Sequence, residues 1–422
     1  MQSRSRRPPK QSPTRRLRRV APPTVIVGAG IAGLTIAERL IAAGTAPADI
    51  LFLEKYDYVG GRIVSHRDGY EIGAGRIHTS HRHMNALINR FDLTRIPLGS
   101  ESLWWPLGAS ESEPNHFETD LRRHLRRFSA IDLRTHTLRQ LLARSLPPAE
   151  LTALLDRFPY RAETETLRAD LALQAFRPRG EMGSRSGFFV VREGLSAVTR
   201  GLREELESAG VRFRFNSEVV RMDPDGTLYL RNSDRPIHPA RTILALHADA
   251  LQRILPPIAA RPFRQFLRME PLTRIYAAYP PEHPWTQALF AGPSIVTDSP
   301  LRYIIPVNPA TGVVMISYTE GRDTRHWRSL KGPRLAAALH RAAQRLWGSD
   351  TDLPEPLWVR PYEWTAGCTY WRPGDYDPRR VVRVLQHPFP TVWIAGESLS
   401  VGRQAWIEGA LESAHAVADL VT

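Results

Sequence analysis

Cysteine is almost absent from this 422-residue chain, in which Cys368 is the single example. One thiol can neither close a disulfide within the chain nor supply a zinc cluster, so both frameworks are excluded. Long apolar runs are also missing. None reaches the ~20 residues of a membrane helix, and no apolar segment follows the basic N-terminus as in a secretory signal. With 42% hydrophobic residues, the sequence predicts a globular protein with no membrane span and no secretory signal.

Lysine is scarce as well, because arginine carries almost all of the positive charge. The formal net charge is +14, and residues 2–19 hold eight basic residues and no acidic one. The remaining modest excess is typical of a composition bias, so nucleic acid is not expected as a partner. Residues 1–22 are predicted to be a disordered basic tail, with a transit peptide or a weak polyanion contact as alternatives. We expect a cytoplasmic protein, or one targeted to an organelle through this N-terminus.

Residues 24–54 carry the strongest pattern, a predicted strand, turn, helix and second strand. Residues 25–27 are an apolar β-branched run, residues 34–43 are helix formers, and residues 50–53 are a second apolar run. The turn between the first strand and the helix carries three glycines with the spacing GxGxxG: Gly28, Gly30 and Gly33. A plain glycine-rich turn is the alternative, but the flanking strands and helix favour a dinucleotide site.

Each of these glycines has its own role in such a site. Gly28 permits the tight turn, Gly30 lets a pyrophosphate approach the backbone, and Gly33 lets the helix pack close to the sheet. The free N–H groups at the start of the helix carry a partial positive charge that attracts a diphosphate. Glu54 ends the second strand 21 residues after Gly33, where a carboxylate accepts hydrogen bonds from an adenosine ribose.

Two further glycine turns follow, and each carries an arginine. The first is Gly60-Gly61-Arg62 and the second is Gly73-Ala74-Gly75-Arg76. A glycine pair followed by arginine suits a close approach of the backbone to a phosphate, with a planar guanidinium beside it. A hairpin turn with a surface arginine is the alternative. Next to the first motif, we expect both turns to line the same cofactor.

The rest of the chain divides by pattern. Residues 83–91 and 119–177 are mostly helical, carry no glycine-rich motif and are predicted to form a helical insertion. Residues 251–363 are rich in strands and punctuated by proline, which predicts an antiparallel sheet in a second domain. The chain closes with a short strand, the pair Gly396-Glu397 and a helix that begins near Ile407.

Together these motifs resemble the FAD-dependent amine oxidase family, which includes monoamine oxidases and L-amino-acid oxidases. The resemblance covers nearly everything after residue 22 and rests on these motifs in order: Gly28-x-Gly30-x-x-Gly33, Glu54, Gly60-Gly61-Arg62, Glu218-Val219-Val220, Ala395-Gly396-Glu397 and Trp406-Ile407-Glu408-Gly409-Ala410.

The resemblance implies an α/β fold with two domains. A discontinuous, Rossmann-like FAD-binding domain would comprise residues 23–80, 188–250 and 380–422. An α+β substrate domain would combine an antiparallel sheet in residues 251–379 with the helical insertion at 81–187.

The resemblance also assigns contacts to FAD. Glu54 would hold the adenosine ribose, Arg62 the diphosphate, and Val219 would meet the adenine through its backbone. The helix that begins at Ile407 would point its positive end at the isoalloxazine, which favours the anionic reduced flavin. Glu397 would lie at the ribityl and diphosphate end. The implied cofactor-binding set is Gly28, Gly30, Gly33, Glu54, Gly61, Arg62, Gly75, Arg76, Val219, Glu397 and Ile407.

The implied catalytic residues are Arg76, Arg274 and Trp406. Arg76 corresponds to the arginine that grips the substrate carboxylate in the L-amino-acid oxidase branch, and a guanidinium is a two-pronged clamp for a planar anion. An arginine that serves only the flavin or the fold is the alternative. Trp406 falls where the family often places an aromatic facing the flavin. Tyr370 and Trp371 are candidates for other walls of the amine site, or are core or surface aromatics.

Arg274 departs from the family pattern. Much of the family has a lysine here that holds a water against flavin N5 and assists the reaction with oxygen. Arginine stays protonated and is longer, so it cannot copy a lysine with a lowered pKa.

Cys368 and a group of three histidines could each have a functional role or be ordinary residues of the fold. Cys368 lies near the position where some mammalian monoamine oxidases attach flavin covalently, but its spacing to Pro373-Gly374 is shorter, and a plain buried thiol is the alternative. His78, His81 and His83 lack a matching carboxylate set, so we expect loop histidines and no metal site.

These observations predict an FAD-dependent oxidoreductase that deaminates an L-amino acid or a related primary amine. A hydride would pass from the α-carbon to flavin N5, and the products would be a keto acid, ammonia and peroxide, with molecular oxygen as the second substrate. Alternatives are an amino-acid monooxygenase, a polyamine or other amine oxidase, a desaturase, and an isomerase that uses reduced flavin. A polyanion-binding protein is an alternative of another class. A homodimer is possible.

Overall fold

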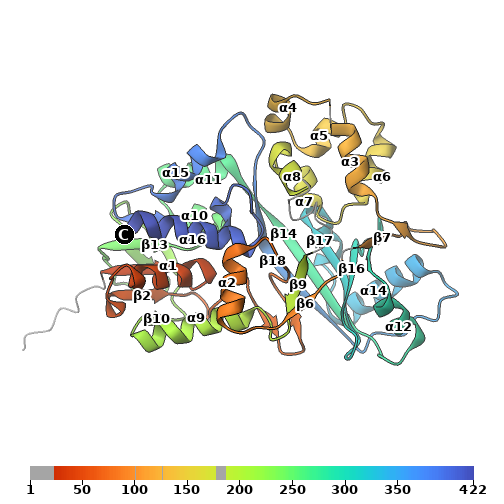
Figure 1. Ribbon diagram of the computed structural model, residues 1–422, viewed down its shortest axis with the longest axis horizontal. Coiled ribbons are helices and arrows are strands. Elements are labelled where there is room, and N and C mark those ends of the chain that lie inside the picture. The colour runs from red at the N-terminus through yellow and green to blue at the C-terminus, as the bar shows by residue number, and fades with distance from the viewer. Residues whose placement is uncertain (1–22, 100, 126, 177–186) are drawn as a thin grey trace, which may run out of the picture.

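Two sheets organise the fold of this chain (Figure 1). The computed structural model describes residues 23–99, 101–125, 127–176 and 187–422. The predicted basic tail, residues 1–22, lies outside the described residues. Within them, no helix has both the length and the apolar character needed to cross a membrane.

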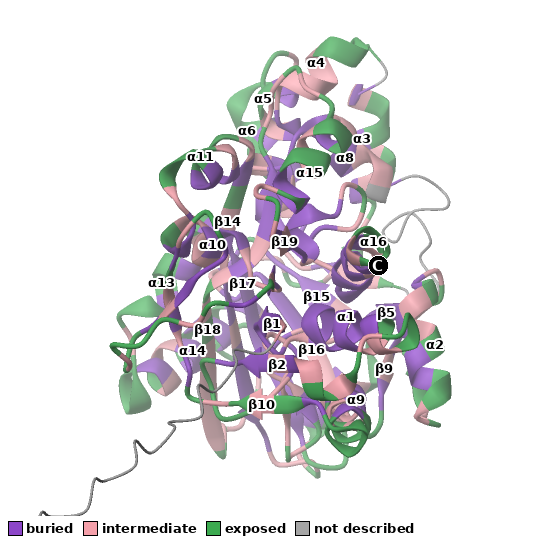
Figure 2. Cartoon of the chain, turned by 90° about the vertical axis from the view of Figure 1, so that its left-hand side faces the viewer, coloured by how far each residue is buried: buried purple, intermediate pink, exposed green. Residues whose placement is uncertain are grey.

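The first sheet has five parallel strands in the order β10-β2-β1-β13-β19. Its strands are β1 (Thr24–Val27), β2 (Ile50–Leu53), β10 (Arg212–Arg214), β13 (Arg241–Leu244) and β19 (Val392–Ile394). Most of its side chains are buried and many are β-branched, which is typical of a parallel sheet covered on both faces (Figure 2). One face is covered by α1 (Ile31–Ala42) and by the two helices that pack against it, α9 (Ser196–Ala209) and α16 (Ile407–Val421).

The second sheet has seven strands in the order β18-β14-β17-β16-β15-β7-β8. Its strands are β7 (Ser102–Trp104), β8 (Glu113–Pro114), β14 (Leu267–Ala278), β15 (Ser294–Val296), β16 (Tyr303–Asn308), β17 (Val313–Glu320) and β18 (Trp358–Trp371). All neighbours are antiparallel except β15 and β7.

The two faces of this second sheet have different partners. Along β14, Ile275 and Ala277 join a hydrophobic cluster with α12 (Pro284–Ala291) and α14 (Gly332–Trp347). Leu272 and Tyr276 belong to the other cluster, because successive side chains of a strand point to opposite faces. The first face therefore buries a local core, and the second is free to meet the lobe built on the parallel sheet.

A group of short helices lies over one corner of the second sheet (Figure 1). It contains α3 (Phe117–Leu125), α4 (Ala130–Thr135), α5 (Leu138–Leu142), α6 (Pro148–Asp156), α7 (Arg161–Glu165) and α8 (Ala169–Ala175). Capping boxes at Ser129 with Asp132 and at Thr137 with Gln140 start α4 and α5.

The remaining elements connect these layers. They are β3 (Ser65–His66), β4 (Tyr70–Glu71), β5 (Ile77–His78), β6 (Arg95–Pro97), β9 (Phe188–Val191), β11 (Val219–Met222), β12 (Leu228–Leu230), α2 (Arg82–Arg90), α10 (Ala248–Ile254), α11 (Pro257–Phe266), α13 (Arg325–Arg328), α15 (Pro378–Gln386), η1 (Pro47–Asp49), η2 (Gly321–Thr324) and η3 (Glu397–Leu399).

The predicted α/β fold class is confirmed, but one segment differs from its prediction. Residues 81–187, expected to be a helical insertion, also contain β6, β7 and β8. β7 and β8 extend the second sheet through pairs with β15 and with each other. They are only three and two residues long, too short for a pattern along the sequence to reveal. The domain limits given above stay a prediction.

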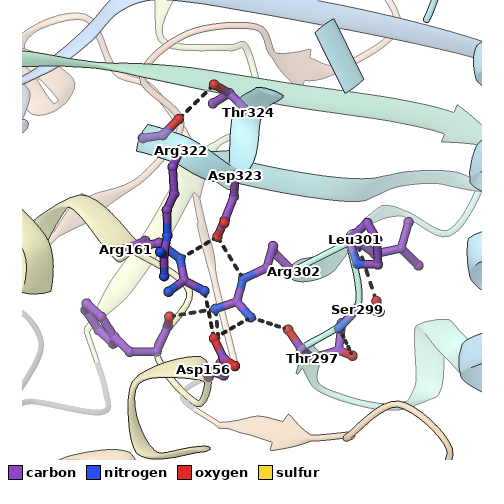
Figure 3. A network of polar contacts seen from close by, with 12 residues as sticks. Asp156, Arg161, Thr297, Ser299, Leu301, Arg302, Arg322, Asp323 and Thr324 are labelled. Atoms are coloured by element: carbon purple, nitrogen blue, oxygen red, sulfur yellow. Dashed lines mark hydrogen bonds and ion pairs between the residues drawn. The ribbon is translucent and has the colours of Figure 1, made fainter. Parts of the chain in front are cut away.

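Four charged residues lock the helical group to the second sheet (Figure 3). Arg161, at the start of α7, pairs with Asp156 at 2.7 Å and with Asp323 in η2 at 2.6 Å. Arg302, next to β16, pairs with the same two carboxylates at 3.4 and 3.3 Å. Both arginine side chains are less than a tenth exposed. Two nearly buried cations are thus shared between two carboxylates.

We expect Asp323→Ala to destabilise the protein strongly. The substitution leaves Arg302 with Asp156 as its one carboxylate partner, whereas Arg161 keeps Asp156 and Glu165. Removing one partner of a buried ion pair costs about 3 kcal/mol or more. Thermal unfolding of the holoprotein measures this as a clear fall in Tm. Asp419→Ala is the matched control, because its pair with Arg39 is on the surface and such pairs contribute little. Equal melting of the two variants would contradict the structural role of the network.

Candidate active site

The three glycines after β1 meet different constraints. Gly28 has a φ of +100°, and a Cβ there would lie 2.6 Å from the Ala245 carbonyl oxygen. A Cβ on Gly33 would lie 2.3 Å from the Gly28 carbonyl oxygen. Gly30 has an ordinary φ of −74°, and its Cβ would meet nothing closer than the Gly60 oxygen at 3.9 Å. The fold therefore requires Gly28 and Gly33, whereas Gly30 keeps the entrance to α1 open.

Glu54 lies against this turn and is 6% exposed. Its Oε2 accepts the Ala29 N–H at 2.7 Å and its Oε1 accepts the Tyr56 N–H at 2.9 Å. The Glu54 carbonyl oxygen accepts the Ser217 N–H at 2.7 Å, two residues before the buried Val219 that begins β11. The residues assigned to ribose and adenine therefore lie at the same end of the parallel sheet.

Arg62 joins the N-terminal and C-terminal motifs. Its Nη1 lies 2.8 Å from Oε1 of Glu397 and donates to the Gly367 carbonyl at 2.6 Å. Glu397 is 5% exposed and also accepts the Thr369 hydroxyl at 2.9 Å. A Cβ on Gly61 would lie 3.5 Å from the Cα of Gly30, so the second glycine turn borders the first.

This arrangement fits a dinucleotide such as FAD. No side chain caps the start of α1, so its N–H groups and the macrodipole remain available to a diphosphate beside the open Gly30. Glu54 borders this turn through Ala29, and Gly61, the neighbour of Arg62, borders it at Gly30. The predicted cofactor residues are thus brought together, and their individual contacts with FAD stay a prediction.

The segment from Gly73 to Arg76 packs between the two lobes. A Cβ on Gly73 would lie 1.9 Å from the Arg62 carbonyl oxygen, and one on Gly75 would lie 3.0 Å from Nη1 of Arg274. Just before the segment, the Glu71 carbonyl oxygen accepts hydrogen bonds from Arg274 Nη1 at 3.1 Å and from a β14 tyrosine hydroxyl. Gly73 is therefore required for the close fit, a side chain at Gly75 would press on the guanidinium of Arg274, and Arg274 holds the segment in place.

Arg76 ends this segment with its guanidinium among aromatic rings. Its Nη2 donates to the hydroxyl of Tyr160, and its guanidinium carbon lies 5.3 Å from the Tyr160 ring, 5.1 Å from Phe188 and 6.0 Å from Trp406. Within the described ranges, no carboxylate lies within ion-pair distance of it. Burial opposes its charge, but neighbouring tyrosine oxygens outweigh burial and raise the pKa of Arg76, so it stays a cation.

Trp406 borders the start of α16. Its ring stacks on Phe188 at 5.7 Å and meets the edge of His81 at 5.1 Å. No side chain caps the N-terminus of α16, whose first residue, Ile407, is buried. The carboxylate of Glu408 instead accepts two backbone N–H groups at the start of α2. The positive end of α16 is thus uncapped beside Trp406, as a flavin at this end requires.

A polar cluster lies on the adjoining face of the second sheet. Arg274 pairs with Tyr318 in the register of β14 and β17, and Glu320 follows two residues later on the same face. The Tyr318 hydroxyl donates to Glu320 Oε1 at 2.6 Å. Burial raises the pKa of Glu320 to about 7.

Sequence reasoning missed Tyr160, Phe188 and Glu320. The first two lie in segments without a motif and meet Arg76 only through the tertiary fold. Glu320 had one visible signal, which is an acid at the end of the apolar run 313–318.

Other candidates have ordinary surroundings. Trp371 is fully buried and its indole donates to the Ser400 carbonyl at 2.9 Å, so it is a core residue. Burial raises the pKa of the Cys368 thiol, which favours the unreactive protonated form. Across the described residues, no group of three histidine, cysteine or acidic side chains is placed to hold a metal.

A parallel sheet, a glycine turn, an uncapped helix start and a buried glutamate beside the turn together fit a dinucleotide-binding protein. The chain belongs to the flavin-containing amine oxidoreductase family, whose family model matches residues 31–422. The predicted family, enzyme class and FAD cofactor are confirmed.

An L-amino-acid oxidase and a putrescine oxidase are similar to this chain over most of its length. The chain is 24% identical to an L-amino-acid oxidase of Crotalus adamanteus over 450 aligned positions, which cover 92% of this chain and 84% of the relative. It superposes on a putrescine oxidase solved with putrescine, with a TM-score of 0.74 and 18% identity, covering 94% and 98% of the two chains. A farnesylcysteine lyase of Arabidopsis thaliana is 36% identical, over 86 residues or 18% of this chain.

Gly30→Val tests the diphosphate path. We expect the variant to fold, because its Cβ meets open space, but to bind FAD at least ~10-fold more weakly, because the side chain blocks the approach to α1. Flavin absorbance per mole of purified protein measures the loss, and far-ultraviolet circular dichroism reports folding. Gly99→Val is the control, since Gly99 is exposed and its Cβ meets nothing. Equal flavin content in the two variants would remove Gly30 from the cofactor path.

Proposed function

We propose that this enzyme oxidatively deaminates an L-amino acid and that Arg76 binds the carboxylate of its substrate. The observation that carries the proposal is the guanidinium of Arg76, which is enclosed by tyrosine, phenylalanine and tryptophan rings and has no carboxylate partner in the described part of the chain. Arg76 is only partly exposed, and a partly desolvated cation is stabilised when an anion pairs with it. A substrate carboxylate supplies that anion.

The charge of Arg76 favours an amino acid over a diamine. The putrescine oxidase whose fold this chain shares was solved with putrescine, a molecule with no anionic group. A diammonium ligand would place a positive charge beside an unpaired guanidinium, which is unfavourable. The likeness to the Crotalus adamanteus L-amino-acid oxidase over 92% of the chain supports the same substrate class.

The residues around Arg76 provide position and charge. Arg76 would clamp the carboxylate and so orient the α-carbon hydrogen. Trp406 and Phe188 would form an apolar wall that keeps water from the amine. Arg274 would act by holding the segment that carries Arg76. If the amine enters neutral, this scheme requires no catalytic base.

FAD would lie along the N-terminus of α1, with its ribose at Glu54, its adenine near Val219 and its diphosphate near Arg62. When bound, FAD would accept a hydride from the α-carbon and pass the electrons to oxygen, which gives peroxide. The amino acid loses two electrons to become an imine, which water converts to a keto acid and ammonia. An amino-acid monooxygenase would share the carboxylate site and would form an amide instead.

Arg76→Ala tests the carboxylate clamp. A charge-assisted hydrogen bond contributes about 1.5 to 3 kcal/mol, so we expect kcat/KM for L-amino acids to fall by roughly ten- to a hundred-fold. Anaerobic reduction of the flavin by the twenty amino acids, with keto acid and peroxide assays in air, measures the effect. Arg76→Lys should recover only part of the loss, because lysine lacks the two-pronged geometry.

Two controls separate the clamp from general damage. Arg67→Ala removes an arginine whose side chain is 88% exposed, and it should leave turnover unchanged. The decarboxylated amines of the same amino acids should be oxidised equally by the wild type and Arg76→Ala. If L-amino acids fail to reduce the wild-type flavin and carboxylate-free amines succeed, the proposed function is wrong.

A further inference from the structure

Glu320 is a buried carboxylate with an unused oxygen. It is 3% exposed, its Oε1 accepts the Tyr318 hydroxyl, and no hydrogen bond reaches its Oε2. The N–H of Ala162 lies near the carboxylate, yet burial outweighs both donors and raises its pKa. Throughout the described residues, no arginine, lysine or histidine lies within ion-pair distance of it. Arg274 favours the charged form of Glu320 and Glu270 opposes it, so a further cation bound beside Oε2 would stabilise the ionised carboxylate.

The other buried glutamates near the site do not share this property. Glu54 uses both carboxylate oxygens to accept backbone N–H groups, and so does Glu408. Glu397 receives a hydroxyl on one oxygen and a backbone N–H on the other. Each carboxylate oxygen of these three residues receives at least one donor, whereas Oε2 of Glu320 receives none.

Tyr370 adds a second unused group close by. It is 2% exposed and its hydroxyl has no hydrogen-bond partner. Glu320 raises the pKa of this hydroxyl, after burial itself, and also that of the Tyr318 hydroxyl. A carboxylate and a hydroxyl with free lone pairs are acceptors that suit an ammonium or guanidinium group.

Tyr160 and Tyr318 connect Glu320 to Arg76. Tyr160 bonds to Arg76 and its ring lies 5.5 Å from that of Tyr318, edge to face. Tyr318 in turn bonds to Glu320. An unpaired cation and an under-compensated carboxylate thus lie at the two ends of a layer of two tyrosines, whose rings suit the apolar stem and charged end of a long cationic side chain.

We propose that Glu320 binds the cationic end of the substrate side chain, so that the substrate is a basic L-amino acid of the lysine, ornithine or arginine class. The inference rests on the proposed function, because Arg76 must hold the carboxylate at the other end of the same molecule. Glu320 forms the ion pair, and Tyr160 and Tyr318 pack along the methylene stem.

The test compares L-lysine with L-norleucine, which has the same chain without the ammonium group. The ratio of their kcat/KM values is measured at pH 8 in the holoenzyme and in Glu320→Gln. We expect the wild type to prefer lysine, and the substitution to lower the lysine-to-norleucine ratio by ~30-fold or more, since the lost pair is buried. Glutamine keeps the size and the acceptor for Tyr318, so norleucine oxidation should persist.

Glu363→Gln is the matched control. Glu363 is a carboxylate on β18 that already pairs with Lys331, and its removal should leave the ratio unchanged. A wild type that oxidises norleucine as well as lysine would overturn the inference about Glu320 and leave the proposed function standing, and this outcome needs no variant. An unchanged ratio in a folded Glu320→Gln would also overturn it. If no amino acid is oxidised, both proposals fall.

Discussion

The carbonyl oxygen of Glu71 joins the two lobes by accepting hydrogen bonds from both Tyr276 and Arg274. It accepts the hydroxyl of Tyr276 at 2.6 Å and Nη1 of Arg274 at 3.1 Å, both from β14 of the second sheet. A few residues on, the Ala74 N–H donates to the Arg62 carbonyl at 2.9 Å. The short segment ending at Arg76 is therefore tied to the substrate-side sheet at one end and to the cofactor-side turn at the other.

The hydrogen bond to Glu71 gives Arg274 a structural role. Its long side chain reaches across from β14 to the backbone of the neighbouring lobe. A guanidinium has several donors and a fixed charge, which suits an anchor better than a proton carrier. The same anchored segment places Arg76 against Tyr160, at one end of the layer formed by Tyr160 and Tyr318. Glu320 lies at the far end of that layer, and leaving both charges under-compensated costs stability that a bound zwitterion with a cationic tail would restore.

Local patterns in the sequence predicted the cofactor lobe well. The glycine turn, β1, β2 and the final helix have local sequence patterns. Gly28 is fixed by its positive φ and Gly33 by the carbonyl oxygen of Gly28, five residues earlier. The substrate side was less predictable. Tyr160 reaches Arg76 from a helical group, and β7 joins β15 from a distant segment. β18 was not predicted at its full length, because Pro361 and Gly367 interrupt its pattern, as an edge strand permits.

The central claim is that Arg76 is a receptor for a carboxylate, and ligand binding without turnover tests it most directly. Butanoate and butylamine are matched in length and differ in the charged group. Each is titrated into the oxidised holoenzyme while the visible flavin spectrum is followed. The account predicts that butanoate perturbs the spectrum of the wild type, competes with amino-acid substrates and loses this effect in Arg76→Ala. Binding of butylamine alone, or binding of butanoate that does not depend on Arg76, would contradict it.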